Sequence, residues 1–226
     1  MIKIIAFDAD DTLWHNEHYF QQSEQKFCEL LEDYLPQHTV QRELLKTEIE
    51  NISLYGYGIK AFMLSMIETA IRISDGTVKM GRIEKMIAIG KELLDKPVEL
   101  MDGVEDVLKT LIPKYKLVLA TKGDLLDQER KLKKSGLINY FHHIEIMSEK
   151  KEPDFEKLIK HLDIKPAELM MIGNSIKSDI LPILNIGGHG IHIPYHVTWA
   201  HEKVEATVDH ANFKQVEKIS DILQFL

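Results

Sequence analysis

Three aspartates, Asp8, Asp10 and Asp11, stand close together near the start of the chain. They follow residues 2–7, a nearly continuous apolar run of the kind that forms a strand buried on both faces of a parallel sheet. Because successive strand residues point to opposite faces, Asp8 and Asp10 would share a direction if the strand continued. Carboxylates this close repel one another unless a cation or hydrogen bonds offset the repulsion. Ligands of parallel sheets bind at the carboxyl ends of the strands, so the pattern predicts a functional carboxylate site there.

Four later apolar runs resemble the first one, and helix-length amphipathic stretches lie between them. The predicted strands are residues 116–120, 144–147, 169–172 and 190–193, and the predicted helices are residues 104–111, 125–135, 155–162 and 176–186. Alternation of strands and helices is typical of a parallel sheet with helices on both faces. We therefore predict a three-layer, Rossmann-like α/β domain of at least five strands.

One stretch of the chain interrupts this alternation. Between about residues 16 and 95 no run resembles a strand, and apolar residues recur at helical spacing in four successive segments. Glycine and proline residues separate these segments. The sequence therefore predicts an all-helical cap domain, residues 15–95, inserted into a sheet domain formed by residues 1–14 and 96–226.

The segment from Asp8 to Thr12 resembles the first motif of the haloacid dehalogenase superfamily, DxDx(T/V), and the helical insertion after it matches the place where that family carries a cap. The resemblance implies that Asp8 is a nucleophile that becomes transiently phosphorylated. It also implies that Asp10 protonates the leaving oxygen and later activates water, and that Thr12 orients the loop. Asp11 is expected to be a local hydrogen-bonding or capping residue.

The family's second and third motifs have counterparts at the ends of the next two predicted strands. Thr121 stands where the family has a serine or threonine, and its hydroxyl would bind phosphate together with the turn that contains Lys122 and Gly123. The third motif is a lysine that neutralises the charge of the nucleophile and the phosphate. Lys150 is the favoured candidate, and Lys151 remains an alternative.

The fourth motif of the family is acidic and binds Mg2+. Asp179 fits its second acidic position, whereas Asn174 stands where the family usually has aspartate. An amide oxygen can still be a magnesium ligand, but it brings no negative charge. The resemblance implies a magnesium site that draws on the carboxylates of Asp8 and Asp179, the main-chain carbonyl of Asp10, and Asn174.

Composition limits the kinds of partner that the chain can have. The 226 residues carry a formal net charge of −8, which gives no general attraction for nucleic acid or for acidic membrane surfaces. The single cysteine, Cys28, excludes an internal disulfide and is expected to be a buried structural thiol. No apolar run is long enough for a membrane span, and the N-terminal run is too short for a signal peptide, so we expect a cytoplasmic protein. The sequence leaves the oligomeric state open.

These features together predict a magnesium-dependent phosphatase that hydrolyses a small-molecule phosphate monoester through an aspartyl-phosphate intermediate. A phosphomutase shares this chemistry and remains an alternative. A haloacid dehalogenase has no alkoxide leaving group to protonate and lacks the second aspartate of the first motif, so Asp10 favours phosphoryl transfer. A phosphate-binding protein without catalytic activity would be expected to lose Asp8 or Asp10, and both are present.

Two further segments are candidates for contact with substrate. Residues 54–60 combine two glycines with Tyr57 and Lys60, which could pack on a ligand and meet a second anionic group. The alternative is a turn between helices whose tyrosines pack on the core. Residues 194–202 follow the fifth predicted strand and could border the pocket, but packing of Trp199 against the domain is the plainer explanation.

Overall fold

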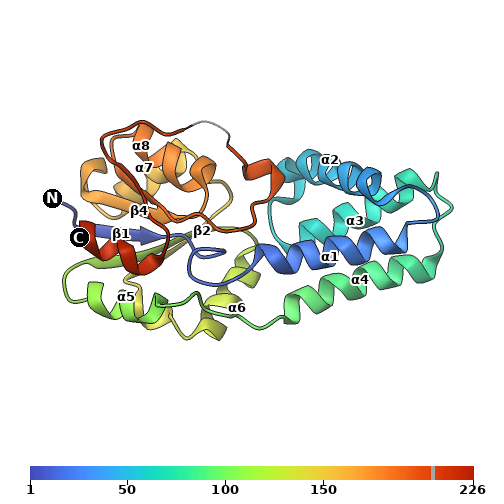
Figure 1. Cartoon of the computed structure of the whole chain (residues 1–226), viewed down its shortest axis with the longest axis horizontal. Helices are drawn as coiled ribbons and strands as arrows, with labels where there is room; N and C mark the ends of the chain where they lie inside the picture. The colour runs from blue at the N-terminus through green and yellow to red at the C-terminus, as the bar shows by residue number, and fades with distance from the viewer. Residues whose placement is uncertain (205–206) are drawn as a thin grey trace. The chain divides into compact units, whose positions relative to one another are not determined.

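The structure is a computed structural model, which describes residues 1–204 and 207–226, and the chain forms two compact units. The sheet unit consists of Met1–Glu17, Val98–Lys122 and Gln128–Leu226, and the helical unit consists of His18–Pro97 and Gly123–Asp127. Figure 1 traces the chain through both units. Among the described residues, no helix is long and apolar enough to cross a membrane.

A parallel sheet forms the centre of the sheet unit. Within the described residues it has six strands, in the order β3-β2-β1-β4-β5-β6. The strands are β1 (Ile4–Phe7), β2 (Lys116–Lys122), β3 (His143–Met147), β4 (Leu169–Gly173), β5 (His189–His192) and β6 (Phe213–Gln215). The first five correspond to the five predicted strands, so the predicted parallel α/β architecture is confirmed. The edge strand β6 is an addition that the sequence analysis does not predict.

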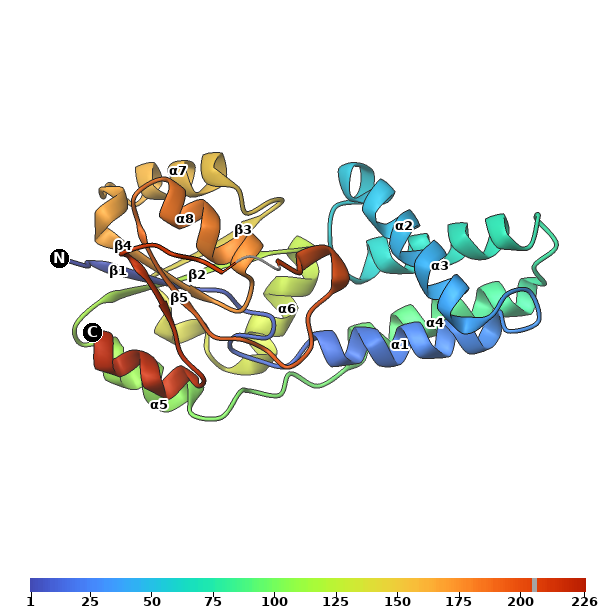
Figure 2. The ribbon, with the colours of Figure 1, turned by 45° about the horizontal axis from the view of Figure 1, so that its top comes forward.

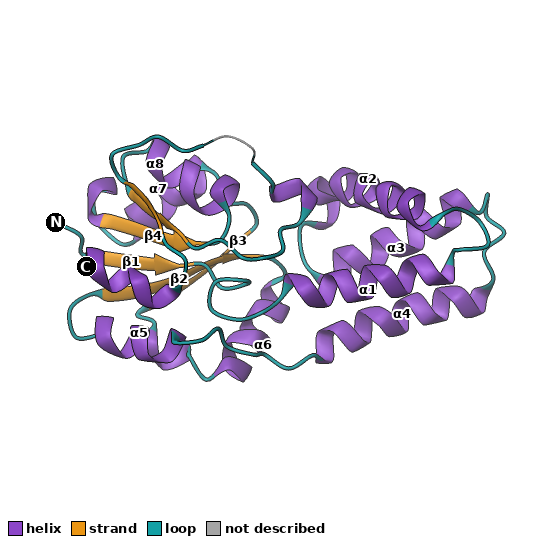
Figure 3. Cartoon of the chain, in the orientation of Figure 1, coloured by secondary structure: helices purple, strands orange, loops and turns teal. Residues whose placement is uncertain are grey.

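Helices cover both faces of the sheet, as Figure 2 shows from a second direction and Figure 3 by the colour of each layer. The helices of this unit are α5 (Val104–Leu111), α7 (Glu152–His161), α8 (Leu181–Asn185) and α6 (Leu125–Ser135) from Gln128 onward. Alternate residues of β1 point to opposite faces of the sheet. Ile5 and Phe7 pack in the same core as α5, whereas Ile4 and Ala6 pack in the same core as α7 and α8. This two-sided burial explains why the strand reads as a continuous apolar run.

The central position of β1 fixes the residues that follow it. Phe7 pairs with Leu119 of β2 on one side and with Ile172 of β4 on the other. The backbone N–H of Asp8 then donates to the carbonyl of Ile172 at 2.9 Å, which extends the ladder by one more residue. Asp8 is therefore held by backbone hydrogen bonding at the carboxyl end of the sheet.

The insertion between β1 and β2 forms helices, as predicted. They are α1 (Glu17–Leu30), α2 (Gln37–Tyr55), α3 (Ile59–Ile73) and α4 (Met80–Asp95). Their apolar faces form a core of their own, which includes Phe27, Leu44, Met66 and Met86. The prediction that Cys28 is buried is confirmed, and burial raises the pKa of its thiol to about 12. This thiol therefore stays protonated and unreactive at neutral pH.

Phe155 on α7 is fully buried in the core between this helix and the sheet. We expect Phe155→Ala to lower the free energy of unfolding by about 3–5 kcal/mol, because it removes a buried ring and leaves a cavity. Urea unfolding followed by circular dichroism measures the change. Phe225→Ala is the control, since the Phe225 ring is 41% exposed, and it should cost less than about 1 kcal/mol. Equal losses in the two variants would contradict this account of the core.

Candidate active site

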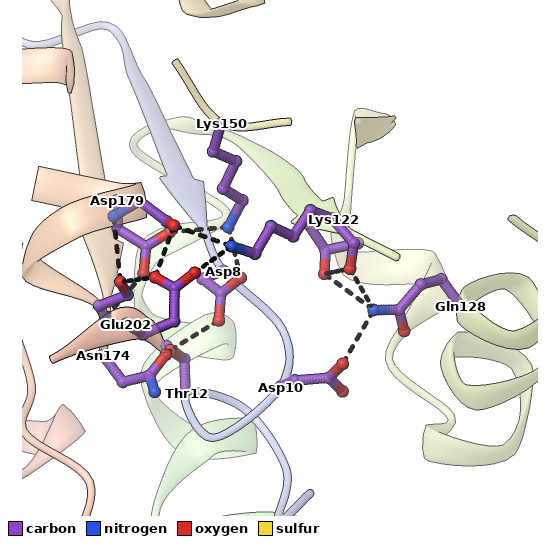
Figure 4. Close-up of polar contacts among 12 residues, drawn as sticks. Asp8, Asp10, Thr12, Lys122, Gln128, Lys150, Asn174, Asp179 and Glu202 are labelled. Carbon is purple, nitrogen blue, oxygen red and sulfur yellow. Dashed lines mark hydrogen bonds and ion pairs between the residues drawn. The ribbon is translucent and has the colours of Figure 1, made fainter. Parts of the chain in front are cut away.

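Lys150 lies between two carboxylates in the interior of the sheet unit (Figure 4). Its ammonium forms ion pairs with Asp8 and with Asp179, the latter at 2.7 Å between Nζ and Oδ1. None of the three side chains is more than 9% exposed. Asp8 follows β1, Lys150 follows β3, and Asp179 lies in the π-helical turn Ile176–Ile180 after β4. The carboxyl ends of three strands thus bring these charges together.

The ammonium of Lys150 offsets the repulsion between the carboxylates of Asp8 and Asp179. Burial raises the pKa of Asp8 to about 7, and the adjacent ammonium of Lys150 works against this rise. Burial alone would lower the pKa of Lys150, but the carboxylates of Asp179 and Asp8 raise it above its ordinary value. Lys150 therefore stays protonated, and its charge favours the ionised Asp8 that nucleophilic attack requires.

A glycine at the end of β4 makes room for Asp179. A Cβ atom on Gly173 would lie 2.7 Å from the Cβ atom of Asp179, closer than nonbonded carbon atoms approach. The Asp179 carboxylate also accepts a hydrogen bond at Oδ2 from the backbone N–H of Ser175, at 2.9 Å. Gly173 and Ser175 thus fix the carboxylate that Lys150 holds together with Asp8.

Oxygen atoms that could ligate a cation gather beside Asp8. With its amide turned to satisfy its hydrogen bonds, the Asn174 nitrogen lies 3.2 Å from the main-chain oxygen of Asp10 and 3.3 Å from Oδ2 of Asp8. The opposite orientation presents the amide oxygen to the same place, at a spacing that suits ligands of one small cation. Among the described residues, no cluster of three or more His, Cys, Asp or Glu side chains could hold a metal ion. A magnesium site here must therefore combine carbonyl and amide oxygens with carboxylates, and the residues present fit that donor set.

The carboxylate of Asp10 is directed toward α6, not toward Asp8 (Figure 4). It accepts hydrogen bonds from Trp14 Nε1 at 2.6 Å and from Gln128 Nε2 at 2.9 Å. The ammonium of Lys131 lies 2.7 Å from both of its oxygens. Asp10 is thus held in a defined position by a cation and two neutral donors. A role for Asp10 in proton transfer would bring substrate into contact with a carboxyl group that these three partners hold.

Thr121 and Lys122 end β2 at the same edge of the sheet. The Thr121 side chain is buried, and its hydroxyl accepts a hydrogen bond from Gln128 Nε2 at 3.1 Å. The ammonium of Lys122 donates to Ser178 Oγ at 2.9 Å and forms an ion pair with Glu202. Through Gln128 and Ser178, the side chains of these two residues are linked to the groups around Asp10 and Asp179.

Glu202 is an acidic residue of this edge that the sequence analysis does not single out. Its carboxylate accepts hydrogen bonds at 2.6 Å from Ser175 and from Ser178, in addition to its ion pair with Lys122. Burial acts to raise the pKa of this carboxyl, but Lys122 and the two hydroxyls outweigh burial and lower the pKa to about 2. Residues 194–202 thus contribute an ionised group beside the turn that carries Asp179.

Two other residues of the first motif have structural roles. The Thr12 hydroxyl donates to Oδ2 of Asp8 at 3.1 Å, which helps to orient the carboxylate. Asp11 accepts hydrogen bonds at Oδ1 from the backbone N–H groups of Asn16, at 2.8 Å, and Glu17, at 3.0 Å. It therefore caps the start of α1, and its predicted capping role is confirmed. Burial raises the pKa of Asp11 to about 7.

The two candidate lysines of the third motif occupy different environments. Lys150 is buried against Asp8, whereas the side chain of Lys151 is 67% exposed, with its ammonium 3.8 Å from Glu149. The structure therefore places Lys150, and not Lys151, where it can neutralise Asp8.

Three of the predicted site residues, Gly123, Tyr57 and Lys60, belong to the helical unit. Lys60 forms an ion pair with Asp124 at 2.7 Å. A Cβ atom on Gly58 would lie 3.2 Å from the backbone nitrogen of Asp124, so the glycine permits this close approach. Segment 54–60 thus forms the turn between α2 and α3 that the sequence allowed. The substrate roles of Tyr57 and Lys60 stay predictions.

Residues 2–187 match the family model of the haloacid dehalogenase-like hydrolases. Because the match covers most of the chain, the protein belongs to this family, and it is a hydrolase. The resemblance noted in the sequence is therefore confirmed. A search of curated proteins found no match.

Solved structures of this family resemble the chain over nearly its whole length. A haloacid dehalogenase-like family hydrolase from Xanthomonas campestris is 37% identical, with a TM-score of 0.88 over 97% of this chain and 88% of that chain. A predicted phosphoglycolate phosphatase from Haemophilus somnus is 15% identical, with a TM-score of 0.64 over 99% of this chain and 97% of that chain. A 2-haloacid dehalogenase from Pseudomonas syringae is also 15% identical, with a TM-score of 0.66 and the same two coverages. The fold is thus shared by proteins described as phosphatases and as dehalogenases.

Gly173→Ala should displace the carboxylate of Asp179, because the new methyl group would overlap it. We expect kcat/KM for the hydrolytic reaction to fall by about 10²-fold, the loss typical of a displacement of about 1 Å in an active site. Gly81→Ala is the control, since no atom lies within 4 Å of a Cβ placed there, and its activity should equal that of the wild type. An active Gly173→Ala variant would show that Asp179 tolerates displacement.

Glu202→Gln tests the charge of Glu202 through the pH dependence of stability. Since the pKa is lowered from 4.5 to about 2, the ionised carboxylate contributes on the order of 3 kcal/mol at neutral pH. This contribution is complete above the unfolded-state pKa and disappears as the pH falls toward the folded-state pKa. Urea unfolding should show the variant to be less stable at pH 7, with a difference that shrinks between pH 5 and pH 3. A difference in stability that does not change with pH would mean that the substitution acts through altered packing and not through the lost charge.

Proposed function

We propose that the protein is a magnesium-dependent phosphatase that hydrolyses a small-molecule phosphate monoester through a phosphorylated Asp8. The observation that carries this proposal is the pair formed by Asp8 and Asp10. One carboxylate is buried beside a lysine, as a nucleophile requires, and the other is held nearby by hydrogen bonds, as a proton donor requires. Cleavage of a carbon–halogen bond releases halide and has no use for the second group.

The chain offers a ligand set for the metal. The carboxylates of Asp8 and Asp179, the main-chain oxygen of Asp10 and the amide oxygen of Asn174 would hold Mg2+, which prefers oxygen ligands. When bound, the cation would offset the negative charge of the phosphoryl group and align it with Asp8. Hydrolases of this family generally use Mg2+, which supports the assignment.

The proposed reaction has two steps. In the first, an oxygen of Asp8 bonds to phosphorus as the ester P–O bond breaks, and Asp10 gives its proton to the departing alcohol. In the second, Asp10 takes a proton from water as the water oxygen attacks phosphorus, which releases inorganic phosphate and frees Asp8. Lys150 keeps Asp8 ionised, and Thr121, with the turn at Lys122 and Gly123, binds phosphoryl oxygens. The partners of Asp10 on α6 hold its carboxyl group in position, and the proton that it gives in the first step is the one that it regains in the second.

A panel of phosphate monoesters assayed with Mg2+ tests this function, with release of inorganic phosphate as the readout. Asp8→Asn should abolish turnover, because an amide cannot attack phosphorus. Asp10→Asn should reduce kcat by about 10²–10⁴-fold, the usual contribution of a positioned acid–base group. A chelator should remove activity, and added Mg2+ should restore it.

Asp163→Asn is the matched control, because Asp163 is exposed in the turn after α7 and has a φ of 54°, which asparagine also tolerates. It should leave turnover unchanged. Chloride release from 2-chloropropionate, with no phosphate release from any ester, would show that the protein is a dehalogenase and not a phosphatase. Transfer of the phosphoryl group to a second alcohol in place of water would identify a phosphomutase.

A further inference from the structure

Glu202 forms a closed set of contacts with the ammonium of Lys122 and the hydroxyls of Ser175 and Ser178. The proposed reaction uses the backbone of the turn at Lys122 but none of these side-chain groups. One carboxylate oxygen pairs with the ammonium of Lys122, and the other accepts from the hydroxyls of Ser175 and Ser178, each at 2.6 Å. Lys122 also donates to Ser178 Oγ at 2.9 Å, so two of the donors are bonded to each other. Without Glu202, these donors would form a preassembled receptor for a carboxylate.

The receptor has the charge and the size of a carboxylate site. It offers one positive charge and two neutral donors, which match the single charge and two oxygens of a carboxylate. The side chains of Lys122 and Glu202 are 17% and 11% exposed, so the contact is largely shielded from water. Such shielding strengthens the charge-assisted hydrogen bonds that hold the anion.

The receptor lies beside the proposed phosphoryl site. Ser178 adjoins Asp179 in the chain, and Asp179 shares the ammonium of Lys150 with Asp8. Ser175 donates its backbone N–H to the same Asp179 carboxylate. A small molecule bound at Asp8 could therefore extend a second group into the receptor.

The segment that carries Glu202 is not part of the sheet. After Ile193, whose N–H donates to Gly173 at 3.0 Å, the described residues up to 204 contain only the 3-10 turn Ala200–Glu202. Side chains tie this segment to the sheet unit: Tyr195 contacts His15 at 2.8 Å, and Lys177 donates to the carbonyl of His201 at 2.7 Å. Glu202 can therefore leave its partners without breaking a β-ladder.

We propose that Lys122, Ser175 and Ser178 form a second anion-binding subsite, which Glu202 fills in the absence of substrate and which selects phosphate monoesters that also carry a carboxylate. This inference rests on the proposed phosphatase function and adds the class of substrate. Glu202 acts in it as an internal competitor: the substrate's carboxylate takes over the same three donors, and Glu202 turns away.

Two matched pairs of esters test the subsite, because the members of each pair differ by the carboxylate. The pairs are 2-phosphoglycolate with ethyl phosphate, and 3-phosphooxypropionate with propyl phosphate. Removing the competing charge in Glu202→Gln should lower KM for at least one acid-bearing ester by about tenfold, the value of one charge-assisted hydrogen bond. Ser178→Ala should raise KM for the same ester by about tenfold. For the neutral esters, KM and kcat should stay within about twofold in both variants.

Glu168→Gln is the matched control, since Glu168 also forms an ion pair with a lysine, Lys3, but lies before β4, at the opposite end of the strands. Glu168→Gln should leave KM and kcat unchanged for both the acid-bearing and the neutral esters. If Glu202→Gln does not fold, as thermal unfolding would show, Ser178→Ala decides alone. Equal changes in KM for acid-bearing and neutral esters would contradict the proposed subsite. Glu202 would then have a structural role only, and the proposed phosphatase function would still stand. If the wild type hydrolyses no phosphate ester, the proposed function fails, and the subsite fails with it.

Discussion

The buried ammonium of Lys150 is the contact on which the rest of the site depends. Asp8 and Asp179 bring two like charges into an interior where an unpaired charge costs several kcal/mol. The strand order explains how the lysine reaches them: β1 and β4 are neighbours and deliver the two acids, and the loop after β3 delivers the cation from beyond β2. Gly173 leaves room for Asp179, whose carboxylate then lies within reach of Lys150. The environment of the Asp8 carboxylate is therefore set by three strands and not by the first motif alone.

Acid–lysine pairing recurs around this centre. Lys131 holds Asp10, and Lys122 holds Glu202. Together with the central triad, these pairs place four carboxylates against three ammonium groups, so the edge of the sheet keeps an excess of negative charge. A dianionic phosphoryl group would be repelled from such a surface unless another cation accompanied it. For the proposed phosphate substrate, this charge balance supports the divalent metal that we propose at the oxygens beside Asp8.

Much of this arrangement could be predicted from the sequence, because buried strands and amphipathic helices have strong periodic signals. Helices α5 and α6 begin and end at the predicted residues. The strand β6 was not predicted, because Phe213–Gln215 is short and largely exposed and therefore lacks the apolar run that marks a buried strand. Gln128 and Lys131 do share one face of a predicted helix, a signal that could have marked them as partners of an acid. The sequence around Glu202 carries no such signal. Its contacts with Lys122, Ser175 and Ser178 depend on the path of residues 194–204, which are largely without regular structure.

The strand order also has a consequence for how the chain acquires its structure. Ile4 pairs with Lys116 and with Leu169, so the first strand made during synthesis has no partner until about a hundred residues have followed it. Contacts between residues so far apart in the chain close large loops and form late. The helices between β1 and β2 make contacts that are mostly local and can form first. Until then, Ile4 to Phe7 is an exposed apolar strand of the kind that associates with other chains, and the yield of folded protein depends on how long that interval lasts.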